Sequence, residues 1–522
     1  MTYIVAGTLM AGHLSSCSSD FLKEYSQDLS RVQSSDDLNE LLLGSCCLPL
    51  SLVANELSSF QRYNDNYVWL HFLPDEIVEN PNLDYYSCYM GLQTEVYPIT
   101  TWQKNLYVDY QGKVTQEGLE NKMWAQAYEC INNCNMVIEA ADGLAPVSDD
   151  DAKTIERIKG EAYYLRASYY LTLANLYGKP YTPATAATDL AVPVKTSPNV
   201  EDKEYQRASV AEVYEQIIAD MNQAEQLLNG NAENLGIYHV SIEAVYILRS
   251  RIALYMQDWQ TAADYARKAI DHNGYLLDLG TVSTDTYPIS KANAEVVYSN
   301  GASNLGNFLY PHPQDDYDVP MFIVSDDLYN LFDVEDYRRT RYVTTDDDLI
   351  NHSPLYHKID NRTSSLGKYK EVSDMFSIRT AEAYLNMAEA KAELGQDAEA
   401  CQWLDQLRDK RVENNEHVSL TGADLMSFIR DERERELCFE GHRWFDLRRY
   451  MVDTRYPFSK EIVHPFSYYS NYRFDKRVYY RLEKNDPAYV LDIPKRVRDF
   501  QPSIGSNVRV DRLPFKTETE ED

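Results

Sequence analysis

The sequence lacks the features that mark several large classes of protein. No stretch reaches the roughly 18 consecutive apolar residues that a transmembrane helix requires, and no Gly/Ser-rich or Pro-rich linker divides the 522 residues. Lysine and arginine are few, 50 against 82 aspartates and glutamates, so the net charge is −32. Such an acidic chain, with no basic run, repels the phosphate backbone of a nucleic acid. We therefore expect one large globular unit with no nucleic-acid partner.

Motifs of catalysis and metal binding are also missing. The chain contains no nucleophile elbow, no H-E-x-x-H, no P-loop and no G-x-G-x-x-G. It has no C-x-x-C pair, and its ten histidines are scattered. The acidic runs at 315–318 and 346–348 lack the glycine and the distal glutamate of a calcium loop, so we interpret them as solvated loops. The sequence thus predicts no catalytic residue, no metal site and no cofactor.

One of the eight cysteines stands out by its position. Cys130 and Cys134 lie four residues apart on a predicted helix, where they would either touch or simply be two small buried residues. Cys17 follows MTYIVAGTLMAGHLSS, an apolar stretch too short to span a bilayer. Leu14-Ser15-Ser16-Cys17 resembles the lipobox of bacterial lipoproteins, although no lysine or arginine precedes the apolar run. The resemblance implies a signal peptide at 1–16 and a lipid on Cys17; the alternative is an ordinary signal peptide with an accidental cysteine.

Helical periodicity dominates several blocks. Between 152 and 177, apolar residues recur at steps of three and four and fall on one stripe. They are Ile155, Ile158, Ala162, Leu165, Tyr169, Leu173 and Leu176. Gly178 is expected to end this helix in a left-handed conformation, which costs glycine least. The next block starts with Ser209-Val210-Ala211-Glu212, a capping-box pattern, and closes at Gly230, which predicts a helix over 208–229.

Two segments look like copies of one helix–turn–helix design. Residues 244–270 are broken at Gln257-Asp258-Trp259, and residues 383–407 are broken at Gly395-Gln396-Asp397. Small residues near these breaks let paired helices approach closely, which is typical of the tetratricopeptide repeat. We expect a mostly α fold, a right-handed tetratricopeptide-like superhelix of interrupted repeats. Its roughly four helix pairs would be 116–143 with 152–177, 208–229 with 240–255, 258–272 with 377–394, and 397–412 with 423–440.

Long segments separate the helical blocks. Residues 44–115, 275–375 and 450–515 are rich in Tyr, Asn, Asp and Pro, with only short β-like runs such as Glu295–Ser299. We expect long ordered loops with short β-strands there. Loops of this length on a rigid scaffold commonly build binding sites.

From Cys17 to about Ile504 the chain resembles the SusD/RagB-like outer-membrane nutrient-binding lipoproteins. The most specific part is IRDERERELCFEGHRWFDLRR at 429–449, which follows the family's ERxxEL-FEG-RWFDLRR pattern. A second block, GEAYYLRASYY at 160–170 with Leu176-Tyr177-Gly178 and Pro193 beyond it, is similar to the family's A-FLRA-YYF-L-N-YG-P stretch. The last twenty residues match only loosely.

This resemblance implies a fold and a function. It implies a single SusD-like domain over 17–522, with tetratricopeptide-like helices near 116–177, 208–272 and 377–440. Family members are lipid-anchored on the extracellular face of the outer membrane and are not enzymes. They bind a glycan, or in some cases a peptide, and deliver it to a SusC-like TonB-dependent transporter. The helical face would then dock the transporter, and the loop-rich side would bind the ligand.

The 429–449 block also suggests a hydrolase, because paired carboxylates perform acid–base chemistry. Its acidic residues are Glu432, Glu434, Glu436, Glu440 and Asp446. Arginines alternate with them, however, and guanidinium groups neutralise carboxylates rather than raise their pKa. We interpret the block as a structural ion network that pins the C-terminal loops against the last repeat.

Tyrosine is the informative excess, with 42 residues. A phenol ring covers the C–H face of a sugar while its hydroxyl reaches polar groups. Tyrosines on predicted helices, namely Tyr163, Tyr164, Tyr169 and Tyr170, are assigned to the core. Loop aromatics are the candidate ligand contacts, although each would alternatively close a local minicore. The candidates are Tyr63, Tyr67 and Trp69; Trp102, Asn105, Tyr107 and Tyr110; and Tyr310, His312 and Tyr317, with Asp65, Asn66 and Asp315 as weaker hydrogen-bonding partners.

Three functions remain in competition: a surface nutrient receptor, a tetratricopeptide adaptor and a glycoside hydrolase. An adaptor should present a basic or apolar groove with little loop decoration, whereas about half of this chain is loop-rich. A hydrolase should show turnover. Within the receptor hypothesis, the aromatic content favours a glycan over a peptide.

Overall fold

The computed structural model describes residues 32–48, 67–82, 96–114, 119–230, 235–300, 305–309, 320–345, 354–359, 372–470 and 473–519. The predicted signal peptide at 1–16 and Cys17 lie outside these residues. Within them, no helix is both long and apolar enough to cross a bilayer.

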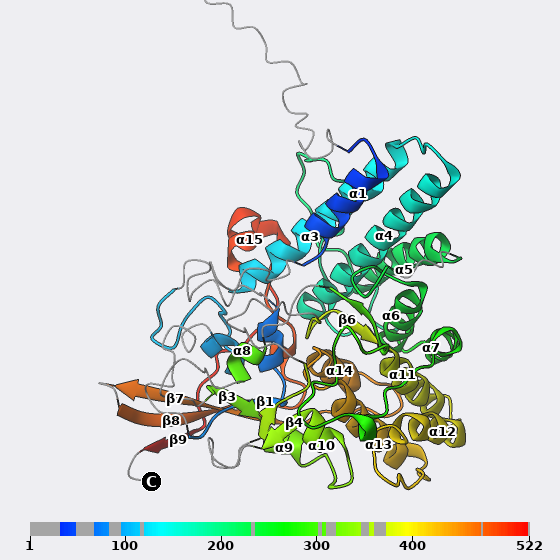
Figure 1. The fold of residues 1–522 in the computed structure, drawn as a ribbon. Helices are drawn as coiled ribbons and strands as arrows, with labels where there is room; N and C mark the ends of the chain where they lie inside the picture. Colours follow the sequence, from blue (N-terminus) through cyan, green and yellow to red (C-terminus); the bar gives the residue numbers. More distant parts are fainter. Residues whose placement is uncertain are drawn as a thin grey trace, which may run out of the picture.

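The helices form a stack along one side of the molecule. They are α3 (Leu119–Gly143), α4 (Asp149–Tyr177), α5 (Val210–Leu228), α6 (Ile242–Tyr255), α7 (Trp259–His272), α11 (Thr380–Glu393), α12 (Asp397–Arg408) and α13 (Gly422–Leu437). Each packs on the next in this order, and Figure 1 shows the succession from α4 down to α12. The predicted mostly α, tetratricopeptide-like fold is confirmed. Both predicted breaks also lie where the structure turns, between α6 and α7 and between α11 and α12.

The start of α5 follows the predicted capping box. The Ser209 hydroxyl accepts a hydrogen bond from the Glu212 amide at 3.2 Å, and the Glu212 carboxylate accepts one from the Ser209 amide at 2.7 Å. Gly230 lies just beyond the helix with φ 87°, a left-handed conformation that glycine adopts at little cost. The sequence signal for this helix is therefore confirmed at both ends.

Gly178 ends α4 for a different reason than predicted. Its φ is −99° and its ψ 163°, so the residue is extended rather than left-handed. A Cβ atom at this position would lie 2.8 Å from the Ala174 carbonyl oxygen and 3.0 Å from the Ala191 Cβ. Glycine is needed here because two chain segments approach closely.

The loop-rich segments contain many short elements. The helices are α1 (Ser35–Leu41), η2 (Leu42–Cys46), η4 (Val68–Phe72), η5 (Leu279–Thr281), α8 (Gly306–Leu309), α9 (Asp326–Tyr329), α10 (Arg338–Arg341), α14 (Arg443–Met451), η6 (Pro487–Tyr489), α15 (Lys495–Phe500) and η7 (Pro502–Ile504). The strands are β1 (Ile77–Glu79), β2 (Val296–Ser299), β3 (Phe322–Val324), β4 (Val343–Thr345), β5 (Pro354–Tyr356) and β6 (Ser377–Arg379), paired antiparallel as β1–β3, β2–β6 and β4–β5. Strand β2 lies in the predicted β-like run.

The prediction of loop over 450–515 is wrong in one part. β7 (Ile462–Ser470) and β8 (Arg473–Leu482) form a long antiparallel hairpin, and β9 (Lys516–Thr519) pairs with β8. Alternate residues are buried in both strands, for example Val478, Tyr480 and Leu482 in β8, which is the period of a half-buried strand. Pro465 concealed β7, because proline within a strand is tolerated mainly at a sheet edge, and β7 is an edge strand.

One large hydrophobic core joins the helical stack to the loop-rich side. The tyrosines that were assigned to the core are found there: Tyr164, Tyr169 and Tyr170 are buried, and Tyr163 packs against the core while partly exposed. The core therefore fixes the loop-rich side relative to the helices.

Candidate functional site

The 429–449 block forms α13, a tight turn and α14, and its charged side chains are buried. The Glu436 carboxylate has no solvent exposure, and three guanidinium groups contact it. They belong to Arg338, Arg379 and Arg411, at N–O distances of 3.1, 3.0 and 2.8 Å. Desolvation of this carboxylate is thus offset by several charge-assisted hydrogen bonds.

The network reaches segments that are distant in the sequence. Arg379, at the end of β6, also binds Glu295 at 3.0 Å and Glu440 at 2.6 Å. The Lys358 ammonium donates to the carbonyl oxygens of Glu436 and Cys438 at 2.6 and 2.8 Å. Most of these partners lie in the 275–375 insertion and in β6, so the predicted role is corrected: the network chiefly ties that insertion to α13.

The C-terminal loops are held by fewer bonds from the same block. The Asp75 carboxylate links the two segments, because it binds Arg443 of the block at 2.8 Å and Lys460 of the C-terminal segment at 2.5 Å. Arg448 donates to the carbonyl oxygens of Tyr489 and Gly178, both at 2.6 Å. This is the pinning role that the sequence predicted for the whole block.

The electrostatics of the block favour structure over acid–base catalysis. Burial alone would raise the pKa of Glu432 and Glu436, but the adjacent guanidinium groups outweigh it and hold both pKa values well below the usual range. Glu434 is the exception, because burial raises its pKa to about 8 although Arg443 partly opposes the shift. All three carboxylates are buried against arginines, where a substrate has no access.

A second gathering of residues, which we name the tyrosine cluster, lies around β7 and β8. It consists of Tyr97, Tyr110, Phe466, Tyr468 and Tyr480. The ring centroids of Tyr97 and Phe466 lie 4.9 Å apart, and those of Tyr110 and Tyr468 lie 5.7 Å apart. Most pairs meet edge to face, the arrangement that aromatic quadrupoles prefer.

Some rings of the tyrosine cluster are buried, and others are partly exposed. Phe466 and Tyr480 are buried, whereas Tyr97, Tyr110 and Tyr468 are half-buried. The hydroxyl oxygens of Tyr97 and Tyr480 lie 3.2 Å apart. Burial raises the pKa of Tyr468 and Tyr480, so both hydroxyls stay protonated near neutral pH and can donate as well as accept. Fixed, partly exposed rings with neutral hydroxyls suit a ligand that alternates C–H faces and hydroxyl groups.

Two of the predicted ligand residues, Tyr67 and Trp69, are each only 1% exposed. The Tyr67 hydroxyl donates to the Met123 carbonyl oxygen at 2.8 Å. The Trp69 ring packs against Phe72 and Phe308, at centroid distances of 5.8 and 5.2 Å. The chain itself covers their ring faces, which is the minicore alternative, so they offer no surface for a ligand in this structure.

Trp102 is also 1% exposed. Its indole stacks on His464 with centroids 4.5 Å apart, and its N–H donates to the Leu73 carbonyl oxygen at 2.9 Å. Its φ of 51° is uncommon for a bulky residue. Arg509 donates to the Trp102 carbonyl oxygen at 3.3 Å and so helps to fix this backbone. The structure thus gives Trp102 a positioning role in its loop rather than an exposed stacking face.

The remaining predicted ligand residues lie either in the same loop as Trp102 or outside the described residues. Tyr110 belongs to the tyrosine cluster, and Asn105 and Tyr107 are half-buried in the same loop. Tyr97, Phe466, Tyr468 and Tyr480 were not predicted from the sequence, although alternation along β7 would have placed Phe466 and Tyr468 on one face. The predicted residues outside the described parts of the chain are Tyr63, Asp65, Asn66, Tyr310, His312, Asp315 and Tyr317.

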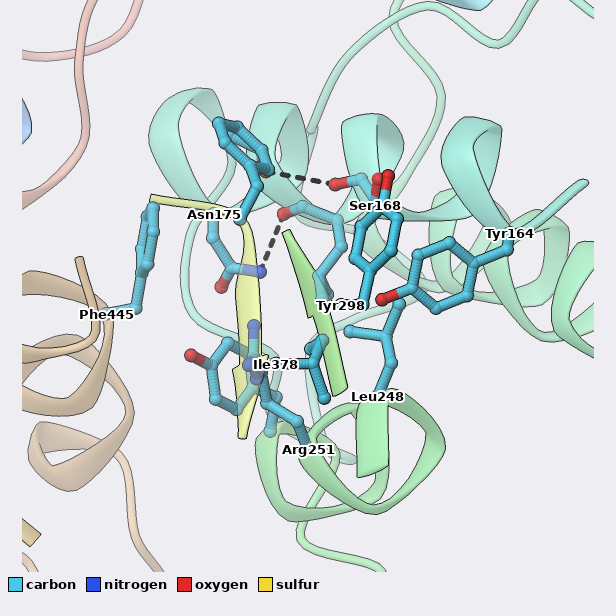
Figure 2. Close-up of a pocket in the computed structure, with 12 residues that line it drawn as sticks. Tyr164, Ser168, Asn175, Leu248, Arg251, Tyr298, Ile378 and Phe445 are labelled. Atoms are coloured by element: carbon cyan, nitrogen blue, oxygen red, sulfur yellow. Dashed lines mark hydrogen bonds between the residues drawn. The ribbon is translucent and has the colours of Figure 1, made fainter. Parts of the chain in front are cut away.

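The described residues also line cavities away from the tyrosine cluster, and two of them bear on the ligand. The first, of about 50 Å³, is enclosed by α4, α6, β2 and β6, and Figure 2 shows Tyr164, Tyr298 and Phe445 among its lining residues. It has room for about one or two waters rather than for a sugar ring. The second is a groove of about 890 Å³ between 235–243 and 291–297. Its size suits an oligosaccharide, but Tyr238 is the one phenol ring among the described residues that line it.

The described parts of the chain contain no group of three or more His, Cys, Asp or Glu side chains arranged to hold a metal ion.

Comparisons with known proteins agree with this architecture. A family model described as "SusD family" matches residues 351–508, and one described as "Starch-binding associating with outer membrane" matches residues 21–254. SusD-like protein P2 of Formosa agariphila is 25% identical over 383 residues, covering 64% of this chain and 72% of that protein. SusD-like protein P25 of the same organism is 22% identical over 391 residues, covering 63% and 70%.

Solved structures share the fold. A SusD-like carbohydrate binding protein from Bacteroides vulgatus superposes with a TM-score of 0.65 at 22% identity, covering 90% of this chain and 96% of that one. A SusD superfamily protein from Bacteroides thetaiotaomicron gives a TM-score of 0.65 at 23% identity, covering 91% and 100%.

Proposed function

This chain belongs to the SusD/RagB-like family, and on that premise we propose that it captures a glycan at the cell surface and delivers it to a SusC-like TonB-dependent transporter. The description of one matching family model as starch-binding supports a glycan as the ligand class. In this proposal the protein sits on the extracellular face of the outer membrane, anchored by a lipid on Cys17 after removal of residues 1–16. It acts as a single domain and performs no chemistry on its ligand.

The observation that carries the ligand proposal is the tyrosine cluster. Its half-buried rings are fixed by edge-to-face contacts, so a sugar that stacks on them orders few side chains and loses little entropy. We place the glycan against Tyr97, Tyr110 and Tyr468, with Asn105 and Tyr107 as neighbouring contacts. Tyr310, His312 and Tyr317 remain proposed contacts from the insertion.

The absence of catalysis is part of the proposal. The acidic residues of α13 that would be the best candidates for hydrolysis are buried against arginines. A glycosidase needs two accessible carboxyl groups on either side of the scissile bond. Binding without turnover is the function that the described residues support best.

Calorimetry with a panel of soluble polysaccharides and peptides tests the proposal. For the ligand that binds, Tyr110→Ala and Tyr468→Ala should each weaken affinity about tenfold, or about 1.4 kcal/mol. Tyr275→Ala is the matched control, because Tyr275 is 46% exposed and lies outside the tyrosine cluster. It should bind as the wild type does.

The other outcomes are informative in different ways. If Tyr238→Ala weakens binding and the cluster variants do not, the ligand lies in the groove. If only peptides bind, the chain is a peptide-binding member of the family. Release of reducing ends from any glycan, abolished by a single carboxylate substitution, would overturn the non-enzymatic proposal.

A further inference from the structure

The groove of about 890 Å³ between residues 235–243 and 291–297 lies apart from the tyrosine cluster. The start of α6 and the end of α7 border it. Figure 1 shows α6 and α7 at one side of the molecule and β7 and β8 at the other. The volume of the groove falls within the range of about 300–1,000 Å³ that is usual for small-molecule sites. A ligand in the groove would therefore leave the tyrosine cluster free for another.

The wall formed by residues 235–243 is fixed to the body of the protein on two sides. The Ile237 carbonyl oxygen accepts a hydrogen bond from the Ser299 amide of β2 at 2.8 Å. The Val240 amide donates to the Glu161 carboxylate of α4 at 3.1 Å, and the same carboxylate lies 3.1 Å from His239 Nδ1. A groove whose wall is already ordered loses little conformational entropy when a ligand binds.

The charged side chains of the groove do not select an ionic ligand. Arg157 forms an ion pair with Glu161, and His272 Nδ1 lies 3.0 Å from the Glu243 carboxylate. An ionic ligand would have to compete with these pairs. Lys291, the third lining residue with a permanent charge, is exposed to solvent, where salt screens it. The groove therefore favours an uncharged ligand.

The groove offers neutral polar atoms beside apolar ones. The Asn273 side-chain oxygen accepts from the Tyr275 amide at 3.1 Å, while its NH2 group has no partner among the described residues. The Nε2 atoms of His239 and His272 are likewise unused within the described part of the chain. A sugar hydroxyl both donates and accepts, so it can bind Nε2 in either tautomer of a histidine. The partly exposed ring of Tyr238 supplies an apolar face for the C–H side of a sugar.

We propose that the groove is a second glycan site, which takes an uncharged segment of the polysaccharide that the tyrosine cluster also binds. This step rests on the proposed function and adds a preference for long chains. A polysaccharide held at one site reaches the other in an intramolecular step, so the two contacts together bind more tightly than either alone. A short oligosaccharide gains nothing from the second site except a second place to bind.

Calorimetry with maltotetraose, xylotetraose, cellotetraose and mannotetraose, and with tetragalacturonate as the charged comparison, tests the assignment. An uncharged tetrasaccharide that binds should occupy two sites on each wild-type chain. Tyr238→Ala and Ala294→Leu should each leave one site, and the second change fills the groove from an exposed position. The parent polysaccharide should bind both variants at least tenfold more weakly than the wild type.

Tyr275→Ala is the matched control, because Tyr275 belongs to the neighbouring segment but does not line the groove. It should keep two sites and the wild-type affinity for the polysaccharide. All three variants should keep the wild-type melting temperature, which separates a lost site from a lost fold.

Each other result has a defined meaning. If one tetrasaccharide binds per chain and only Tyr468→Ala weakens it, the groove assignment is overturned and glycan capture stands. If no tetrasaccharide and no parent polysaccharide binds, both are overturned. Binding of tetragalacturonate alone, lost in both groove variants, would overturn the uncharged ligand class. If the groove variants abolish all binding and Tyr468→Ala has no effect, the groove is the glycan site and the tyrosine cluster is not.

Discussion

The ion network around α13 and the tyrosine cluster beside β7 use their side chains in opposite ways. In the network, Glu436, Arg379 and Arg411 are fully charged groups with no solvent exposure, and each is held by several partners. In the cluster, largely apolar rings such as Tyr97 and Tyr110 remain partly exposed. Buried charge is costly unless every partner is present, whereas an exposed ring costs little and stays available to a ligand.

This contrast separates architecture from binding. The network joins β6 and the 275–375 insertion to α13, so removal of one member leaves an excess of buried charge on the others. Four of the five cluster rings contact two or three others, and the loss of one ring leaves no uncompensated charge. We therefore expect network substitutions to affect stability and cluster substitutions to affect binding.

The largest expected effect is that of Arg379→Ala. This change removes the one guanidinium that contacts Glu295, Glu436 and Glu440 together, and Arg411 and Lys358 then pair with them only in part. The uncompensated buried charge should lower the free energy of unfolding by about 3–5 kcal/mol. Urea denaturation measures the loss. Arg267→Ala is the control, because its pair with Asp271 is more than half exposed and should be worth under about 1 kcal/mol.

A small loss for Arg379→Ala would break the comparison. It would mean that the buried carboxylates recover their partners by rearrangement, and the network would no longer differ in kind from a surface ion pair. If the folded fraction of this variant bound the glycan more weakly, the ion network would also contribute to the ligand site. That result would contradict the separation of stability from binding.

The helical stack could be predicted because its signals are local. Ser209 and Glu212 lie one turn apart, and the apolar stripe of α4 repeats every three to four residues, so both are visible in a short window of sequence. The buried pairing of the 429–449 carboxylates was predictable for the same reason, since arginines alternate with them. What the sequence did not reveal was the identity of their distant partners, such as Arg338 and Arg411.

The tyrosine cluster could not be predicted because it is assembled over long distances. Tyr97 and Tyr110 meet Phe466 and Tyr468 only after the β7–β8 hairpin has formed, and Pro465 concealed that hairpin. The burial of Trp102 likewise depends on His464, a distant residue. The sequence therefore drew attention to the loop that contributes Tyr110 to the tyrosine cluster, but it did not indicate which rings of that loop are buried.

An intermediate effect on stability is expected at Glu79. Unlike Glu436, this buried carboxylate has one oxygen without a hydrogen bond. The Oε2 atom of Glu79 accepts from the Ser467 amide at 2.9 Å, while its Oε1 is buried without a hydrogen bond. Burial raises the pKa of Glu79 from 4.5 to about 7, although Ser467 and Arg477 oppose the shift. The folded state thus holds this proton more tightly than the unfolded state does.

Glu79 should therefore stabilise the fold below pH 4.5 relative to high pH, and this contribution should be lost as the pH rises to about 7. Glu79→Gln stays neutral throughout. It should exceed the wild type in stability by about 3 kcal/mol at pH 8 and match it at pH 4. Urea denaturation of both proteins at both pH values gives the difference in their free energies of unfolding. Other buried acids titrate in both proteins, so their contributions cancel in this difference. Equal stability at pH 8 would show that Glu79 is solvated or paired in solution.

The smallest effect on stability is expected from the helix cap at the start of α5. Ser209→Ala removes the hydroxyl that accepts from the Glu212 amide, while the Glu212 carboxylate keeps its bond to the Ser209 backbone amide. The free energy of unfolding should fall by about 1 kcal/mol, and Ser209→Gly should cost only a few tenths because glycine is itself tolerated as an N-cap. A loss for Ser209→Ala as large as that for Arg379→Ala would contradict the argument, because a cap involves one neighbouring turn whereas Arg379 joins three distant segments. If the two losses differ by the expected factor of three or more, then the signals that are easiest to recognise in this sequence are also those on which its stability depends least.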